Sequence, residues 1–163
     1  MDEVIIRKAQ REDCKAIADL IQELADFERM RDGPKIDHSV LEKDGFDAEH
    51  PAFVCYVADF NKTIIGYTIA YYTYSTWHGR AMHLEDLYVT LKYRGRQMGS
   101  RLLKAIAKEA TGNNCCRLDF SVLVWNPAQN FYQKKGATDL TVEEGWHQYR
   151  FSDAALKNMA IDA

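Results

Sequence analysis

Apolar residues near the start of the chain recur at the spacing of an amphipathic helix. The apolar positions, three or four residues apart, are Ile17, Leu20, Ile21, Leu24 and Phe27. Side chains at this spacing share one face of a helix, which can pack on a core. A short apolar run at residues 4–7 predicts a strand before this helix, and residues 38–49 predict a second, shorter helix after it.

The middle of the chain has the pattern of β-structure. Residues 51–59, 63–74 and 81–89 are predicted strands, and Asn61-Lys62 is a typical hairpin turn between the first two. Because each run follows the previous one after a short turn, we predict an antiparallel meander in sequence order.

The last third of the chain is predicted to contain both kinds of element. A helix over residues 100–110 should end with Gly112 as its C-cap, and a helix over 125–136 should begin with Asn126 at the N-cap and Pro127 next. Further elements are predicted over 117–124, 138–140, 147–151 and 153–159, the first three as strands and the last as a helix.

The composition is that of a globular protein with a mildly acidic balance. Hydrophobic residues make up 47% and charged residues 28% of 163 positions, which is ordinary for a single domain. Without repeats or low-complexity linkers, the pattern predicts one α+β domain over residues 1–163. The net charge of −3 argues against nucleic acid as the partner and favours a cationic substrate.

The cysteines and the apolar runs indicate where such a protein would work. Cys14, Cys55, Cys115 and Cys116 show no C-x-x-C pairing and no histidine cluster at zinc spacing, so we expect reduced thiols, no metal site and a cytoplasmic location. The first residues carry mixed charges and no apolar core, so no signal peptide is predicted. The longest uncharged run, residues 63–79, is too short and polar to cross a membrane, and no membrane partner is expected.

Residues 84–104 join a predicted strand to a predicted helix through a turn that contains glycine. The strand carries Glu85 and Asp86, and the turn runs R94-G-R-Q-M-G99 into Ser100. Amide groups at the start of a helix are unpaired and carry partial positive charge, so such a turn favours an anion such as a phosphate. Many helix starts look similar, so the turn alone identifies no function.

This strand, turn and helix, followed by a second strand and an N130-F-Y132 helix, resemble the GNAT superfamily of N-acetyltransferases. Within it, the sequence is most similar to diamine and polyamine acetyltransferases of the spermidine/spermine type and their thialysine-acetylating relatives. The matching segments span nearly the whole chain and include L24-A-D-F-E-R-M30, D44-G-F46, Y71-Y-T-Y-S-T-W-H-G-R80, L84-E-D-L-Y-V89, W125-N126 and E143-E-G-W146. The resemblance implies a central, mostly antiparallel, twisted sheet flanked by helices, with two neighbouring strands splayed apart.

The resemblance also implies acetyl-CoA as the cosubstrate, a small amine as the substrate, and a homodimer. Residues implied at the acetyl-CoA site are Leu87, Tyr88, Val89, Arg94, Gly95, Arg96, Gln97, Met98, Gly99, Ser100, Asn126, Pro127, Ala128 and Gln129. Residues implied at the amine site are Phe27, Glu28, Glu85, Asp86, Asp119, Phe120, Ser121 and Glu144.

Acetyl transfer to an amine needs a base, because an alkylammonium has a pKa of about 10.4 and is no nucleophile until it loses a proton. We expect Glu85 to take that proton directly or through a water. Asp86 ranks second, since it should face the other side of the strand unless a β-bulge intervenes. The resemblance singles out Tyr132 as the acid that protonates the departing thiolate. Without the resemblance, Glu85 and Asp86 would be interpreted as strand acids paired with Arg or Lys. Tyr132 would be interpreted as a tyrosine packed in the core.

One position departs from the family pattern. The loop usually reads R/Q-x-x-G-x-G/A, and Gln97 stands in place of its first glycine. Two alternatives to a small-amine acetyltransferase stay open: an enzyme for protein lysines or N-termini and, because of Gln97, a CoA-binding module with impaired catalysis. Phe27 and the Y-S-T-W-x-G-R run favour the thialysine or small-diamine branch.

Overall fold

The computed structural model describes residues 4–161 and divides into two units, one ending at Leu123 and one beginning at Val124. The single domain expected over the whole chain stays a prediction.

The first unit is built on a five-stranded sheet in the order β1-β2-β3-β4-β5. The strands are β1 (Val4–Lys8), β2 (Val54–Phe60), β3 (Thr63–Ser75), β4 (Gly79–Val89) and β5 (Leu118–Asp119). Neighbours from β1 to β4 are antiparallel, whereas β5 runs parallel to β4. Asn61 and Lys62 both adopt left-handed backbone angles, with φ of 50° and 66°, which confirms the predicted hairpin turn between β2 and β3.

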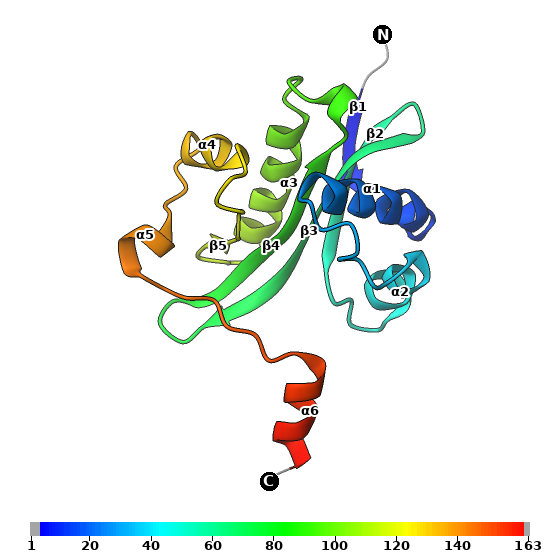
Figure 1. Cartoon of the computed structure of the whole chain (residues 1–163). Coiled ribbons are helices and arrows are strands. Elements are labelled where there is room, and N and C mark those ends of the chain that lie inside the picture. The colour runs from blue at the N-terminus through cyan, green and yellow to red at the C-terminus, as the bar shows by residue number, and fades with distance from the viewer. Residues whose placement is uncertain (1–3, 162–163) are drawn as a thin grey trace. The chain divides into compact units, whose positions relative to one another are not determined.

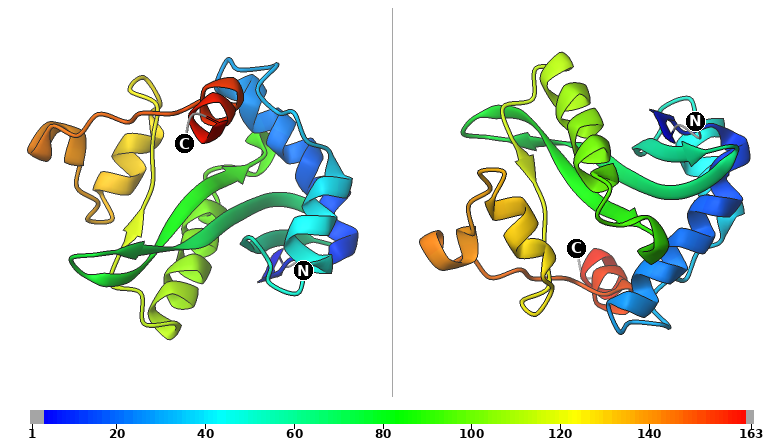
Figure 2. Two further views of the ribbon diagram at one scale, coloured as in Figure 1. Left: turned by 90° about the horizontal axis from the view of Figure 1, so that it is seen from below. Right: turned by 90° about the horizontal axis from the view of Figure 1, so that it is seen from above.

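Helices cover both faces of this sheet. They are α1 (Cys14–Phe27), α2 (His38–Glu42) with the π-helical turn η2 (Lys43–Asp47), and α3 (Met98–Gly112), with short turns η1 (Arg11–Asp13) and η3 (Leu91–Tyr93). Figures 1 and 2 show α1 and α3 on opposite faces of the sheet. The predicted apolar face of α1 is confirmed, because Ile17 and Leu20 are buried against Tyr67 and Ile69 of β3.

The other face of the sheet packs against α3. Leu102 is fully buried there and lies in one cluster with Ala58, Ile65 and Val89 from three different strands. The sheet is therefore the shared wall of two apolar layers, and its strands must present side chains to both.

The second unit contains three short helices: α4 (Ala128–Gln133), α5 (Leu140–Glu144) and α6 (Asp153–Ile161). The helix predicted over 125–136 is shorter in the structure, and Pro127 is its N-cap in place of Asn126. The Oδ1 atom of Asn126 accepts a hydrogen bond from the Ala128 amide at 2.9 Å just before this helix, and Gly136 follows α4 with a φ of 93°. Among the described residues, no helix is long and apolar enough to cross a membrane.

Several predicted elements near the C-terminus are wrong. Residues 138–140 are not a strand, because the Asp139 carboxylate accepts from the Thr141 amide at 3.1 Å and thereby caps α5. Residues 147–151 have no regular secondary structure, and the strand expected over 117–124 is limited to β5. Gly112 is the last residue of α3 and not its cap; Asn113 is the C-cap, and Asn114 takes the left-handed conformation.

Gly45 supplies a test of packing beside the sheet. Gly45 lies in η2, and a Cβ atom at this position would overlap the Phe53 ring. Gly45→Ala should therefore lower the free energy of unfolding by about 1–3 kcal/mol, measured by denaturant titration. Gly112→Ala is the matched control, since no atom lies within 4 Å of the added Cβ, and it should leave stability unchanged or slightly higher. Equal losses in both variants would contradict this packing argument.

Candidate active site

A β-bulge in β4 places two acidic residues on the same face of the sheet. Ala70 of β3 pairs with Leu84, but Ile69 pairs with Asp86, so Glu85 is an extra residue in β4. Side chains alternate between faces along a regular strand, and one extra residue resets this alternation. Asp86 was expected to share a face with Glu85 only if a β-bulge intervened, and this bulge is present.

Asp86 is held by two neighbouring residues of β3. Its Oδ2 atom accepts a hydrogen bond from the Tyr67 hydroxyl at 2.8 Å, and its main-chain carbonyl accepts one from the Thr68 hydroxyl at 2.9 Å. Burial raises the pKa of Asp86 to about 6; the hydrogen bond from Tyr67 opposes this rise, and the charges of Glu85 and Glu28 add to it. Asp86 is therefore an acid that changes charge close to neutral pH.

Glu85 lies at the solvent-accessible side of the same site. Its side chain is 56% exposed, and its Oε2 atom lies 3.7 Å from Nε2 of His83. The Glu85 carboxylate also acts on the Tyr71 hydroxyl, whose pKa is raised mainly by burial and further by this neighbour. The partners found for the two acids are thus a histidine and two tyrosines, whereas a purely structural role would have favoured Arg or Lys.

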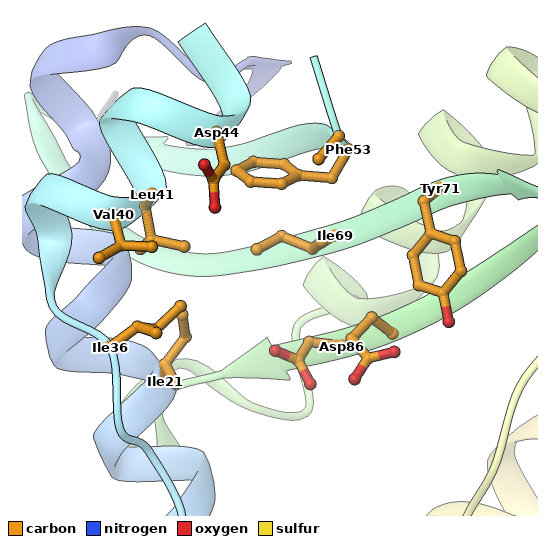
Figure 3. Close-up of a pocket in the computed structure, with 11 residues that line it drawn as sticks. Ile21, Ile36, Val40, Leu41, Asp44, Phe53, Ile69, Tyr71 and Asp86 are labelled. Atoms are coloured by element: carbon orange, nitrogen blue, oxygen red, sulfur yellow. The ribbon is translucent and has the colours of Figure 1, made fainter. Parts of the chain in front are cut away.

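The two acids form part of the lining of a pocket of about 360 Å³ (Figure 3). Ile36, Val40 and Leu41 come from α2 and the segment before it, and Phe53 and Ile69 complete an apolar wall. Asp44 of η2 also lines the pocket, and Figure 3 shows it across Ile69 from Asp86. The volume is in the range of small-ligand sites.

The C-terminal end of α1 contributes the two substrate residues predicted there. Glu28 directly follows α1, its pKa is raised by burial, and its charge acts on Asp86. Three acids predicted at the amine site, Glu28, Glu85 and Asp86, are therefore brought together by the fold. Phe27 packs its ring 4.7 Å from the guanidinium of Arg94.

Arg94 ties the end of β4 to this region. Its Nε atom donates to the Val89 carbonyl at 2.8 Å, and the guanidinium also lies 5.1 Å from the Tyr88 ring. Arg94 was predicted to bind a phosphate. Its guanidinium is held in place by two aromatic rings and a main-chain carbonyl.

The edge of β4 is open beyond the point where β5 ends. The two strands pair only at Met82–Leu118 and His83–Asp119, so the rest of β4 continues without β5, as the splayed strands of the resemblance imply. The Thr90 amide donates to Ile65 of β3 at 3.0 Å, and main-chain groups alternate along a strand, so those of Leu87 and Val89 point to the open edge. Tyr88 instead directs its carbonyl toward Gly66 of β3.

The turn after β4 begins α3 at Met98. The Arg101 amide donates to the Gln97 carbonyl at 3.0 Å, so the amides of Met98, Gly99 and Ser100 precede the first intrahelical bond. Gly95 has a φ of 76°, with open space around it. Gln97 also adopts the left-handed conformation, with a φ of 63° and ψ of 7°, which explains why glycine is the usual residue there.

Residues 119–121 comprise the last residue of β5 and the two residues that follow it. Asp119 pairs with His83 across β4 and β5, and its Oδ2 atom accepts from Arg117 Nε at 2.8 Å. The negative charge of Asp119 is thus partly balanced by the positive charge of Arg117. Phe120 and Ser121 follow β5 without regular secondary structure.

The remaining predicted residues lie in the second unit. Tyr132 is half-buried in α4 with its ring 5.0 Å from that of Phe131, and Pro127, Ala128 and Gln129 form the start of that helix. The Gln129 side chain donates to the Val124 carbonyl at 2.7 Å, and the Glu144 carboxylate accepts from the Trp146 indole. The proximity of Tyr132 to Glu85 stays a prediction.

Sequence reasoning missed Tyr67, Asp44 and His83. Tyr67 and Tyr71 lie four residues apart in a strand, so the sequence indicates that they share a face. Nothing in the sequence pattern indicates that the two acids lie on the same face. Among residues 4–161, no group of three or more His, Cys, Asp or Glu side chains is arranged to hold a metal ion.

The mixed sheet with an opened strand edge, the glycine-containing turn into a helix and the acid pair are the features that the resemblance to N-acetyltransferases implied. The sequence model of the Acetyltransferase (GNAT) family matches residues 5–137, and the chain belongs to this family.

Named relatives agree with this assignment, and a solved structure shares the fold. Thialysine N-epsilon-acetyltransferase of Bos taurus is 41% identical over 96% of this chain and 97% of its own length. Spermidine/spermine N(1)-acetyltransferase-like protein 1 of Homo sapiens is 39% identical over 98% of this chain, which corresponds to 24% of that protein. An integron cassette protein of V. cholerae shares the fold with a TM-score of 0.76 at 23% identity, covering 96% of this chain and 97% of its own.

Gln97 supplies a test of strain in the turn. A non-glycine residue in the left-handed region is disfavoured by about 1–2 kcal/mol, so Gln97→Gly should raise the free energy of unfolding by about 1 kcal/mol in denaturant titrations. Arg96→Gly is the control: the φ of Arg96 is not positive, and glycine there should lower stability by a few tenths of a kcal/mol, roughly. A loss of stability in Gln97→Gly would contradict the strain.

Proposed function

We propose that the protein transfers the acetyl group of acetyl-CoA to a primary amine of a small diamine, polyamine or thialysine-like amino acid. The observation that carries this proposal is the pocket in which Glu85 and Asp86 lie together beside an apolar wall. A carboxylate attracts an ammonium, and an apolar wall suits the methylene chain that such amines carry. The relatives named for thialysine acetylation support the same substrate class.

A third acid in the pocket, Asp44, favours a substrate with two separated polar ends. Asp44 lines the wall opposite Asp86, with Ile69 between them. A diamine could place its reacting nitrogen near Glu85 and Asp86 and its distal ammonium near Asp44. A thialysine-like amino acid would place its α-ammonium there in the same way, so Asp44 suits both substrates.

The cosubstrate would supply the acetyl group as a thioester. The open edge of β4 fits a pantetheine arm, since the main-chain groups of Leu87 and Val89 point away from β3. The unpaired amides of residues 98–100 fit a pyrophosphate, since they carry partial positive charge. From the resemblance, residues 126–129 of the second unit are expected to line the exit side of the cosubstrate, and a homodimer is expected.

Glu85 is assigned as the base. It accepts the ammonium proton directly or through a water, and the free amine then attacks the carbonyl carbon of the thioester. The carbon–sulfur bond breaks as the carbon–nitrogen bond forms. Asp86 and Glu28 attract the ammonium form of the substrate into the site before Glu85 takes its proton, because their negative charge makes the binding of a cation favourable.

Tyr132 is assigned as the acid. Its hydroxyl donates a proton to the departing CoA thiolate, whose pKa is about 8.5 when it resembles a free cysteine, and the phenol recovers a proton as the new amide nitrogen loses one. The products are the N-acetylated amine, free CoA and one proton. Glu85 releases to solvent the proton that it took from the ammonium, so charge and protons balance over the reaction.

Two rival functions predict different substrates. An acetyltransferase for protein lysines or N-termini would need room for a peptide backbone, whereas the pocket is small and bounded by α2 and η2. A CoA-binding module would bind acetyl-CoA without turning over any amine.

The experiment that separates these functions is a substrate panel. Release of CoA thiol would be measured with putrescine, spermidine, thialysine and a lysine peptide, and binding of acetyl-CoA would be measured alongside by calorimetry. We expect turnover of a small diamine or thialysine and little of the peptide. Tight binding of acetyl-CoA with no turnover of any small amine would establish the binding module instead.

Replacing the base should have a pH-dependent effect. Glu85→Gln should lower kcat/KM about 100-fold near pH 7, and the loss should shrink as the pH approaches the amine pKa of about 10.4, where the free amine is abundant. The pH profile of kcat/KM measures this, with exposed Glu12→Gln as the control. A variant to wild-type ratio that stays flat with pH would show that Glu85 has no role as a base.

Replacing the acid should affect turnover more than binding. Tyr132→Phe removes the proton donor and keeps the ring, so kcat should fall about 100-fold or more while KM for the amine changes little. Steady-state kinetics measure the two constants, and Tyr149→Phe, at a tyrosine that is 91% exposed, is the control. An unchanged kcat would exclude Tyr132 as the acid.

A further inference from the structure

Tyr67 is a fully buried polar residue that the proposed reaction does not use. Its ring packs in the core between the sheet and α1, and its hydroxyl is the donor 2.8 Å from the Asp86 carboxylate. The next residue, Thr68, is also fully buried and donates to the main-chain carbonyl of Asp86. Two consecutive residues of β3 therefore bind the side chain and the main chain of one acid.

The register of the strands explains why Tyr67 can reach this carboxylate. Tyr67 pairs with Tyr88, two residues beyond Asp86, so the Tyr67 and Asp86 side chains are diagonal neighbours on one face of the sheet. They share this face only because Glu85 is an extra residue in β4. A phenylalanine at position 67 would fill the same space but would leave the buried side of the carboxylate without its donor.

The electrostatic setting makes a donor at this position important. The groups that act on Asp86 are the Tyr67 hydroxyl from β3, Glu85 from β4 and Glu28 after α1, and the Cys55 thiol of β2 also interacts with it. Asp44 lines the same pocket from η2. Two neighbouring carboxylates and burial all disfavour a charged Asp86, and the donor that opposes them is Tyr67.

We infer that Tyr67 is a positioning residue of the amine site, whose hydroxyl keeps Asp86 charged and turned toward the pocket so that it can hold the substrate cation. Thr68 stabilises the bulge from the opposite face. The inference rests on the proposed function, in which Asp86 binds the ammonium.

A dependence on pH follows from this arrangement. The pKa of Asp86 is raised to about 6, so its charge, and with it the attraction for an ammonium, is present above pH 6 and is lost as the pH falls through this value. The Tyr67 hydrogen bond lowers this pKa, so its removal should move the loss of activity to higher pH. A displacement of about one pH unit would lower kcat/KM about fivefold at pH 6 and leave it nearly unchanged at pH 8.5.

The test compares Tyr67→Phe with Tyr56→Phe. Tyr56 is the matched control because its hydroxyl also donates to a carboxylate, that of Glu109, at 2.7 Å, and it packs with the cluster on the α3 side of the sheet. The ratio of variant to wild-type kcat/KM, taken between pH 5.5 and 9, cancels the ionisation of the amine itself. We expect the ratio to fall at low pH for Tyr67→Phe and to stay flat for Tyr56→Phe.

A double-mutant cycle separates positioning from general destabilisation. In the Asp86→Asn background there is no carboxylate to hold, so adding Tyr67→Phe should change kcat/KM for the amine by less than about twofold. A flat ratio for Tyr67→Phe, or an equal effect with and without Asp86, would overturn the inference.

A second readout does not depend on activity. Carbon-13 NMR of labelled aspartate carboxyl groups, with Asp86→Asn for assignment, follows the titration of Asp86 directly in wild type and in Tyr67→Phe. We expect Asp86 to titrate at higher pH in the variant, and an unchanged titration would refute the role of Tyr67. If wild type acetylates no amine, the proposed function fails, whereas this titration still decides whether Tyr67 controls the charge of Asp86.

Discussion

An extra residue in β4 determines which side chains can act together in this protein. In an uninterrupted strand, Glu85 and Asp86 would point to opposite faces, and one carboxylate would enter an apolar layer without a partner. The bulge turns both toward the pocket. It also brings the Asp86 carboxylate within reach of Tyr67 and its carbonyl within reach of Thr68, so the local defect in pairing is compensated by hydrogen bonds from β3.

Arg94 extends this arrangement to the cosubstrate side of the fold. It binds the Val89 carbonyl and lies between the rings of Phe27 and Tyr88, so one side chain connects α1, β4 and the turn before α3. Because Glu28 follows Phe27 directly, a displacement of α1 at this contact would move an acid of the amine site. The contacts of Arg94 therefore join residues of the proposed amine site to residues of the proposed acetyl-CoA site within the first unit.

Periodicity was enough to predict the parts of the fold that repeat. The helical periodicity of apolar residues such as Ile17 and Leu20 identified α1, and the Asn61-Lys62 turn identified the hairpin, because both signals are local. The short strand expected over 138–140 was wrong because a run of three residues also fits a capped turn, and Asp139 supplies that cap. The other strand expected after Gly136, over 147–151, has no regular secondary structure. The bulge could not be derived from alternation, since it is an exception to alternation. Tyr67 was missed because the chain has nine tyrosines and its importance depends on the bulge.

Gln97 changes the energy of the turn more than its shape. Its backbone takes the left-handed conformation that glycine would take, its carbonyl accepts the first bond of α3, and the amides of residues 98–100 remain at the helix start. A side chain at this position therefore makes the turn less stable but leaves the main-chain donors in the arrangement that favours an anion. The idea of a CoA-binding module with impaired catalysis was motivated by this one residue. With the turn retained, that idea would need support from the catalytic groups, and the acid pair with its Tyr67 donor gives reason to expect chemistry at the amine.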